Sequence, residues 1–203
     1  QVASWSRAHP GHALITVVVN ASDGRDDNPI MPQLMPFDAA ALAAIDTSAR
    51  TTFGTAHLIT PDQVRGRWPT LRAGVLHRGW PRQSAAKGKV MLILDTNDRV
   101  LDAYRRGHAS LRGRAMFGFY GEGDAEAAIF NVQNPVENEA RIRQAVAQGF
   151  IVRTRADSDT VEARRGDYRR FQAALRSGAQ IISTDYYPGA PDPLHLGFVV
   201  RLP

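Results

Sequence analysis

The sequence predicts an α/β protein with a mostly parallel sheet, and three observations carry this prediction. Short apolar runs rich in Val, Ile and Phe are continuous rather than alternating, which is typical of strands covered on both faces. Helical patterns separate these runs, as they do in βαβ units. The 203 residues are enough to bury a sizeable core, and we expect them to belong to a single domain.

Apolar runs predict about five or six strands, since two of the runs lie in one zone in the middle of the chain. Each run is bounded by turn residues or by the start of a helical pattern. The predicted strands are Ala13–Asn20, Lys89–Asp95, Ala115–Tyr120, Ala127–Gln133, Phe150–Arg155 and Ala179–Tyr187.

Helices are predicted between these strands from caps and from the spacing of apolar residues. An Ala-rich helix is expected over Phe37–Thr47, with Asp38 near its start. Two later helices place their apolar residues on one face and end at Gly149 and Gly178. The segment Ala21–Pro36 is expected to be a long irregular loop.

The composition excludes several kinds of site. The chain contains no cysteine, which removes disulfides, thiolate nucleophiles and Cys-based zinc sites. No apolar run approaches the roughly 18 residues of a membrane-spanning helix. The net charge of +5 suits anionic partners such as phosphate groups or lipid headgroups. Because long runs of like charge and an aromatic-rich RNA-binding pattern are both missing from the sequence, we expect no nucleic-acid partner.

Polar residues end the predicted strands at their carboxyl edges. In α/β barrels the active site lies at this edge, so these residues are candidates for a functional site. Strand ends are also polar wherever they meet water, and the pattern alone leaves that explanation open. The series is Asn20, Asp95, Asn131 or Gln133, Arg153 with Arg155, and Asp185. None of the 6 histidines falls at such a position, and the sequence therefore offers no histidine for acid–base catalysis.

Several stretches together resemble one known family. "GFIVRTRADSDTVEAR", followed by "ALRSGAQIISTDYY", closely resembles the last βαβ unit of the bacterial calcium-dependent phosphoinositide phospholipase C family. Earlier stretches resemble the same family in the same order, and the resemblance covers nearly all of the 203 residues. They are "SRAHPGHALITVVV", "HLITPDQVRGRWPTLRAGVLHRGWP", "GKVMLILD", "LRGRAMFGFY" and "AEAAIFNVQNP".

This resemblance implies a TIM-like barrel of the phospholipase C-like phosphodiesterase type. The 203 residues would form the C-terminal part of that barrel, about strands 4–8, since a full barrel needs about 250 residues. The implied reaction is calcium-assisted cleavage of phosphatidylinositol to diacylglycerol and an inositol (cyclic) phosphate. The family's catalytic histidines and most of its calcium ligands come from its first three strands. We therefore expect activity to need an N-terminal segment, present in a longer protein or as a separate fragment.

The resemblance also implies roles for particular residues. Arg153 is expected to be catalytic, because a planar guanidinium donates to two phosphate oxygens at once. The residues expected to bind the inositol headgroup are Arg155, Asp95, Asp185 and Tyr186. Asn20 is expected to ligate calcium in place of a glutamate that the family often carries. A neutral amide oxygen is a weaker ligand than a carboxylate.

Two other functions remain open. The same barrel can host a glycerophosphodiester or sphingomyelin phosphodiesterase, or it can bind anionic lipid without catalysis. Peripheral membrane contact is expected through an apolar loop, although its residues can equally seal the mouth of the barrel. These residues are Ile30, Met31, Leu34, Met35 and Phe37. Because members of the family are usually secreted, we expect a secreted or periplasmic protein.

Overall fold

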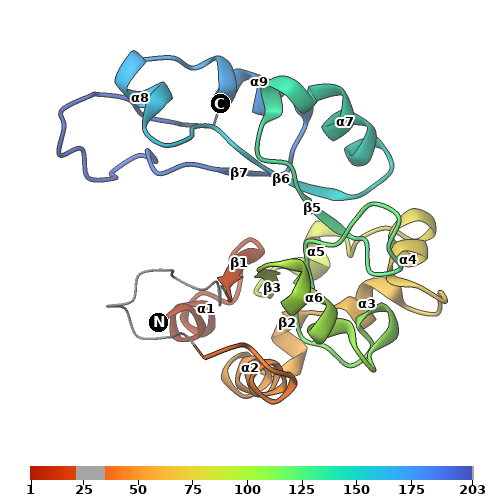
Figure 1. Cartoon of the computed structure of the whole chain (residues 1–203). Helices are drawn as coiled ribbons and strands as arrows, with labels where there is room; N and C mark the ends of the chain where they lie inside the picture. Colours follow the sequence, from red (N-terminus) through yellow and green to blue (C-terminus); the bar gives the residue numbers. More distant parts are fainter. Residues whose placement is uncertain (22–34, 203) are drawn as a thin grey trace. The chain divides into compact units, whose positions relative to one another are not determined.

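The computed structural model describes residues 1–21 and 35–202, which divide into two compact units. Unit 1 is Gln1–Ala128 and unit 2 is Ile129–Pro203. The fold is mixed α/β, and every strand pairing in the described residues is parallel, as the sequence predicts (Figure 1). Each unit has its own sheet and is described by itself below.

Unit 1 is built around the central strand β3 (Val90–Asp95), which is buried up to its last residue. The strand β1 (Ile15–Asn20) pairs with β3 along its whole length. On the other edge of β3, β2 (Leu58–Ile59) pairs with its first two residues, and β4 (Phe117–Gly118) pairs with Ile93 and Leu94. Burial of β3 explains its continuous apolar sequence.

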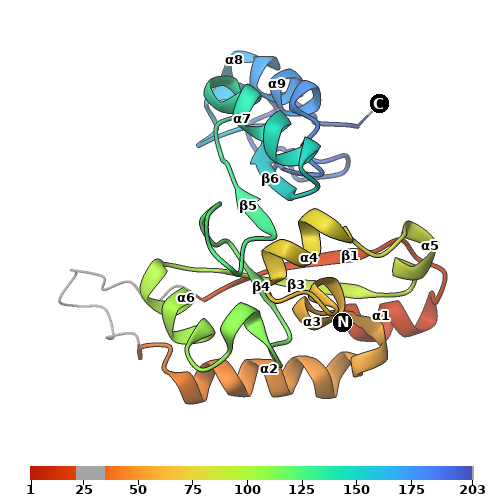
Figure 2. The same ribbon diagram turned by 90° about the vertical axis from the view of Figure 1, so that its right-hand side faces the viewer.

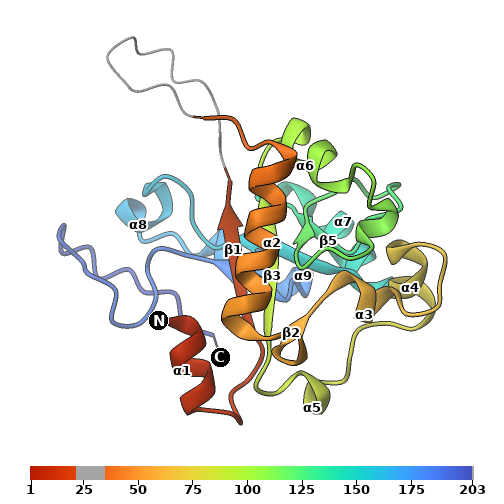
Figure 3. The same cartoon turned by 90° about the horizontal axis from the view of Figure 1, so that it is seen from below.

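Helices and short turns surround this sheet. Among them, α2 covers one face of the sheet, as Figures 2 and 3 show. Asp38 caps α2 by accepting a hydrogen bond from the Ala41 N–H group at 2.8 Å, as its place in the sequence predicts. The elements are α1 (Val2–Ala8), α2 (Ala39–Phe53), η1 (Thr55–His57), α3 (Pro61–Arg65), α4 (Leu71–His77), α5 (Gln83–Ala86), α6 (Asp98–Arg105) and η2 (Ala109–Leu111).

A buried polar network joins α2 to the rest of unit 1. The Tyr104 hydroxyl donates to Asp46 Oδ1 at 2.5 Å, and Arg114 Nη1 donates to Asp46 Oδ2 at 3.1 Å. The Ala115 N–H group donates to Asp46 Oδ1 at 2.9 Å. Burial, followed by the negative charge of Asp46, raises the pKa of Tyr104, so this hydroxyl remains a donor.

Unit 2 contains a three-stranded sheet in the order β5 (Ile129–Asn131), β6 (Ile151–Arg155), β7 (Ile181–Ser183). The helices α7 (Pro135–Ala147) and α9 (Arg169–Ser177) lie side by side on one face of this sheet (Figure 1). The short helix α8 (Val161–Arg165) follows β6.

Glycines end both long helices of unit 2. Gly178 caps α9 with φ of 76°, a left-handed conformation that favours glycine, and this confirms the prediction. The C-cap residue of α7 is Gln148, one residue before the predicted Gly149. Gly149 follows it with φ of 92°.

The predicted strand lengths need correction. The last strand ends at Ser183 rather than Tyr187, because the chain turns where the Tyr186 N–H group donates to Thr184 Oγ1 at 3.0 Å. Only Phe117–Gly118 of the run Ala115–Tyr120 forms a strand. The short strand Leu58–Ile59 is not among the predicted strands, because two residues are too few to show a period.

Candidate functional site

Polar side chains gather on one face of the unit 2 sheet. Strand residues point alternately to the two faces, and paired residues of parallel strands point to the same face. The pairs Asn131↔Arg153 and Arg155↔Ser183 therefore share a face, which we call the arginine face. All four of these residues are only partly buried. The opposite face carries the fully buried side chains of Val152 and Thr154, beneath the two long helices.

The guanidinium of Arg153 is held from both neighbouring strands. Its Nε donates to Ser183 Oγ at 2.8 Å on β7, and its Nη1 donates to Asn131 Oδ1 at 3.2 Å on β5. Two bonds from different directions fix the plane of the guanidinium. A guanidinium whose plane is fixed is suited to donating to two oxygens of one phosphate group. The sequence analysis singled out Arg153 and the strand-end Asn131, but it did not predict Ser183 as their neighbour.

Asp157 adds a buried carboxylate beyond the end of β6. This residue is only 2% exposed, and its Oδ2 has no hydrogen-bond partner among the described residues. Its carboxylate accepts hydrogen bonds from the Thr184 side chain and from the Asp185 N–H group, which follow β7. Asp157 therefore links the ends of β6 and β7, the strands that carry Arg155 and Ser183.

Electrostatics at Asp157 favour the protonated form. Burial raises the pKa of Asp157 above its ordinary value, and the hydrogen bonds from Thr184 and the Asp185 N–H group oppose this. The negative charge of Asp185 raises this pKa further, whereas the positive charge of Arg155 lowers it. Carboxyl groups that have a shifted pKa and an oxygen without a hydrogen-bond partner are common at functional sites. Sequence analysis missed Asp157 as a site residue, although it follows Arg155 at the same period of two.

Stability should depend on pH through Asp157. Because its pKa is raised in the folded protein, the unfolded chain loses this proton first as the pH rises. The unfolded state then binds fewer protons, so the free energy of unfolding falls through this window and stays lower above it. The variant Asp157→Asn cannot ionise here, and we expect its stability relative to the parent to improve from about pH 3 to about pH 7.

Urea unfolding at both pH values measures this effect. The control is Asp159→Asn, which removes an exposed carboxylate from the same loop. An Asp157→Asn variant whose relative stability is the same at both pH values, or falls towards neutral pH, would contradict the effect assigned to burial.

Asp185 and Tyr186 lie beyond the end of β7 in different surroundings. Asp185 is exposed and close enough to Asp157 to affect its pKa. The ring of Tyr186 packs edge-on against Phe198, with the ring centroids 5.3 Å apart, beside a small apolar cluster of unit 2. The structure thus brings both Asp185 and Arg155 near Asp157, while the aromatic ring of Tyr186 contacts the C-terminal segment.

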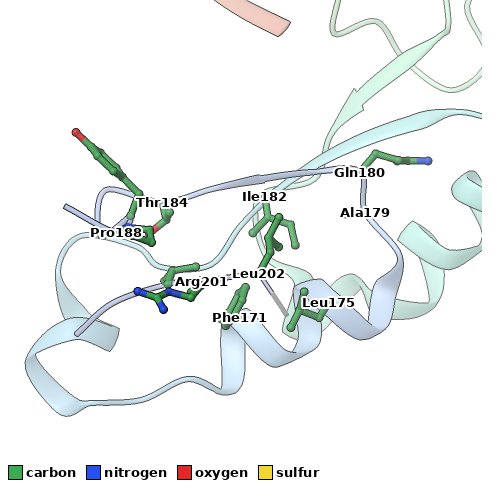
Figure 4. Close-up of a pocket in the computed structure, with 11 residues that line it drawn as sticks. Phe171, Leu175, Ala179, Gln180, Ile182, Thr184, Pro188, Arg201 and Leu202 are labelled. Carbon is green, nitrogen blue, oxygen red and sulfur yellow. The ribbon is translucent and has the colours of Figure 1, made fainter. Parts of the chain in front are cut away.

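An apolar cavity of about 540 Å³ lies on the helix side of β7. Figure 4 shows Phe171 and Leu175 of α9 on one side of it, with Ile182 on β7. Ile182 alternates with Ile181 and Ser183, so it belongs to the face opposite the arginine face. This cavity is therefore not the space next to Arg153.

In unit 1, Asn20 and Asp95 end two neighbouring strands. They are partners in the register of β1 and β3, so their side chains lie next to each other at the carboxyl edge of the sheet. The residues that follow Asn20 and Asp95 are also hydrogen-bonded, because Thr96 Oγ1 donates to the Ala21 carbonyl at 2.7 Å. Calcium prefers oxygen ligands and takes about six to eight of them. Asn20 and Asp95 fit calcium as two members of such a set.

Further calcium ligands must come from other groups. The described residues contain no cluster of three or more His, Cys, Asp or Glu side chains that could hold a metal ion. From the sequence, Asn20 is expected to bind metal and Asp95 to bind substrate. Their register makes Asp95 a second candidate ligand.

The expected membrane loop is only partly within the described residues. Ile30, Met31 and Leu34 lie outside them. Met35 is 88% exposed, and Phe37 is partly buried. In the part of the chain that the structure describes, no helix is both long and apolar enough to span a membrane.

Comparisons with known proteins agree with the expected resemblance. A family model described as Ca2+-dependent phosphoinositide phospholipase C matches residues 1–203. Solved structures of a calcium-dependent phosphoinositol-specific phospholipase C from Pseudomonas sp. match with a TM-score of 0.65 and 19% sequence identity. One of them is described as a myoinositol complex. A Ca2+-dependent phosphatidylinositol-specific phospholipase C from Streptomyces antibioticus matches with a TM-score of 0.59 and 18% identity.

The extent of these matches matters for function. The match to the Pseudomonas structure covers 90% of this chain and 61% of the Pseudomonas chain. The match to the Streptomyces structure covers 92% of this chain and 69% of the Streptomyces chain. At this level of identity the likeness shows the fold. A search of curated protein sequences gave no significant match.

Proposed function

The chain belongs to the Ca2+-dependent phosphoinositide phospholipase C family, and from this premise we propose that it cleaves phosphatidylinositol as the C-terminal part of a TIM-like barrel, about strands 4–8. The products would be diacylglycerol and an inositol (cyclic) phosphate. The observation that carries this proposal is the geometry of Arg153, whose guanidinium is oriented by Asn131 and Ser183 at the carboxyl edge of three parallel strands.

In the proposed reaction the inositol 2-hydroxyl attacks phosphorus. The 2-hydroxyl gives up its proton to a base as the new O–P bond forms, the P–O bond to diacylglycerol breaks, and the leaving oxygen takes up a proton from an acid. Negative charge grows on the non-bridging phosphate oxygens in the transition state. Arg153 is the residue that meets this charge, because its preset orientation needs no rearrangement as the charge develops. Arg155 is the second cation on the same face, and Asp185 accepts hydrogen bonds from inositol hydroxyls.

In the proposed site, Asp157 holds the carboxyl ends of β6 and β7 in place. It links the segments that follow β6 and β7, and it adjoins both Arg155 and Asp185. We assign it the role of a positioning residue. Tyr186 remains a proposed headgroup contact, although its ring packs against Phe198.

Calcium belongs to the proposed reaction as a Lewis acid that offsets the phosphate charge. In this chain Asn20 would bind it through its amide oxygen, with Asp95 next to Asn20 as a candidate second ligand or inositol contact. Calcium needs more oxygens than these two residues supply. The remaining ligands and the catalytic histidines would come from an N-terminal segment, in keeping with the 61% of the Pseudomonas protein that this chain spans.

The proposed substrate is a lipid, and the protein would meet it at a membrane surface. The net charge of +5 favours anionic lipid, and the exposed Met35 side chain belongs to the loop that we expect to touch the membrane. A secreted or periplasmic location would give access to such a surface.

Product analysis separates this function from its alternatives. We expect phosphorus NMR to detect a cyclic inositol phosphate when the chain and its N-terminal segment act together on phosphatidylinositol vesicles. Glycerophosphate or phosphocholine from the corresponding substrates, without cyclic inositol phosphate, would favour a glycerophosphodiester or sphingomyelin phosphodiesterase. Calcium-independent vesicle binding without any product would favour a lipid-binding barrel.

A further inference from the structure

A cationic cleft in unit 1 has no part in the proposed reaction. It has a volume of about 590 Å³ and is formed by the end of α3, the turn that follows, and the end of α4. The residues that line it are Asp62, Gln63, Gly66, Arg67, Trp68, His77 and Arg78. Arg67, His77 and Arg78 are all exposed.

The aromatic and cationic side chains of the cleft are layered. The Trp68 ring stacks on the His77 ring, with centroids 4.5 Å apart and an interplanar angle of 23°. The Arg67 guanidinium lies over the Trp68 ring, 5.9 Å from its centroid. This stacking limits the motion of Arg67 and His77, so less side-chain freedom is lost when they bind a ligand.

Arg78 is held in place by the backbone of the facing helix and turn. Its Nη1 donates to the Gln63 carbonyl oxygen. Gly66 has φ of 55° and ψ of −129°, which only glycine adopts readily, and a Cβ atom there would lie 3.2 Å from Arg78 Nη1. Glycine at this position therefore leaves room for the guanidinium to cross the turn.

The charge of the cleft is not balanced by its one acidic residue. Asp62 Oδ1 accepts from Arg65 Nη2 at 2.7 Å, and Asp62 Oδ2 accepts from the Gly113 N–H group at 2.9 Å. Arg65 does not line the cleft, so its pairing with Asp62 leaves the charges of Arg67 and Arg78 uncompensated.

We propose that this cleft binds a phosphate monoester. Such a group carries a charge of about −1.5 to −2 at neutral pH and three acceptor oxygens, which match two guanidinium groups and a neighbouring imidazole. A phosphodiester carries a single charge and fewer free oxygens, so it fits the cleft less well. The monoester can be a soluble sugar phosphate or the headgroup of a lipid such as phosphatidic acid. The proposal does not depend on phosphodiesterase activity.

Titration calorimetry of the 203-residue chain with inorganic phosphate, at constant ionic strength, tests the site. We expect Arg67→Gln and Arg78→Gln each to weaken binding about tenfold, the usual loss for one charge-assisted hydrogen bond. Arg82→Gln removes the same charge from an exposed position outside the cleft and should bind phosphate like the parent.

The same variants distinguish the source of the ligand. Binding to phosphatidic acid vesicles that is lost in Arg78→Gln identifies a lipid headgroup, and competition by inositol 1-phosphate without vesicle binding identifies a soluble ligand. Either result supports the site. Equal phosphate affinity in the parent, Arg67→Gln and Arg78→Gln would overturn it, as would a loss in Arg82→Gln as large as theirs.

Discussion

Replacing Asp46 by alanine is expected to lower the free energy of unfolding by about 3–5 kcal/mol, the usual cost of breaking a buried ion pair. The side chains of Arg114 and Asp46 are 5% and 10% exposed, so the variant would leave the guanidinium charge buried without its partner. The Tyr104 hydroxyl and the Ala115 N–H group would lose their acceptor as well. Urea unfolding of the 203-residue chain and its variant, followed by circular dichroism, measures the loss.

Two further variants locate this effect in the network. Tyr104→Phe removes one hydroxyl and should cost about 1–3 kcal/mol, because the Asp46 carboxylate loses one donor and keeps two. Ser48→Ala lies on the exposed side of α2 and should change stability by less than about 0.5 kcal/mol. A loss below about 1 kcal/mol for Asp46→Ala would show that the network contributes little to holding α2.

The variant Arg153→Lys is expected to lower kcat for phosphatidylinositol cleavage by about 10²–10³, as when one oriented donor to a developing oxyanion is removed. Lysine keeps the positive charge, but its ammonium group cannot hold Asn131 and Ser183 while it also donates to two phosphate oxygens. The measurement is initial-rate kinetics with the N-terminal segment supplied, together with thermal unfolding of the variant.

A matched control is Arg176→Gln. Arg176 is exposed on α9 and pairs with Glu139 at 3.0 Å on α7, so its loss should leave kcat unchanged. If Arg153→Lys retained full activity, or lost activity only in proportion to a loss of folded protein, Arg153 would be a structural residue between strands.

The parallel strands and the polar edge of unit 2 could be predicted from the sequence, because both follow from the pattern of apolar and polar residues along each strand. Continuous apolar runs mark strands buried on both faces, and Arg153 and Arg155 stand two residues apart on one face of β6. Tyr186 lies beyond the end of β7, where the chain turns, and its ring packs with Phe198. The predicted last strand is too long because no glycine or proline interrupts Thr184–Tyr187 in the sequence.

Contacts between segments that are distant in the chain could not be predicted from the sequence patterns. Asp157 is buried, and the residues that act on its pKa include Thr184 and Asp185, which follow the next strand. Asp46, in an ordinary amphipathic helix, gives no sign in the sequence that Arg114 lies against it. Asn20 and Asp95 are far apart in the chain, and only the register of β1 and β3 makes them neighbours.

Phosphatidylinositol cleavage, first with calcium and then with a chelator, tests the proposed function most directly. The assay uses the chain alone and the chain supplied with the N-terminal segment of the barrel. We predict no cleavage by the chain alone, release of diacylglycerol by the combined protein with calcium, and loss of this release with the chelator. No cleavage by the combined protein under any metal condition, or cleavage that the chelator leaves unchanged, would contradict the proposed calcium-dependent phosphodiesterase.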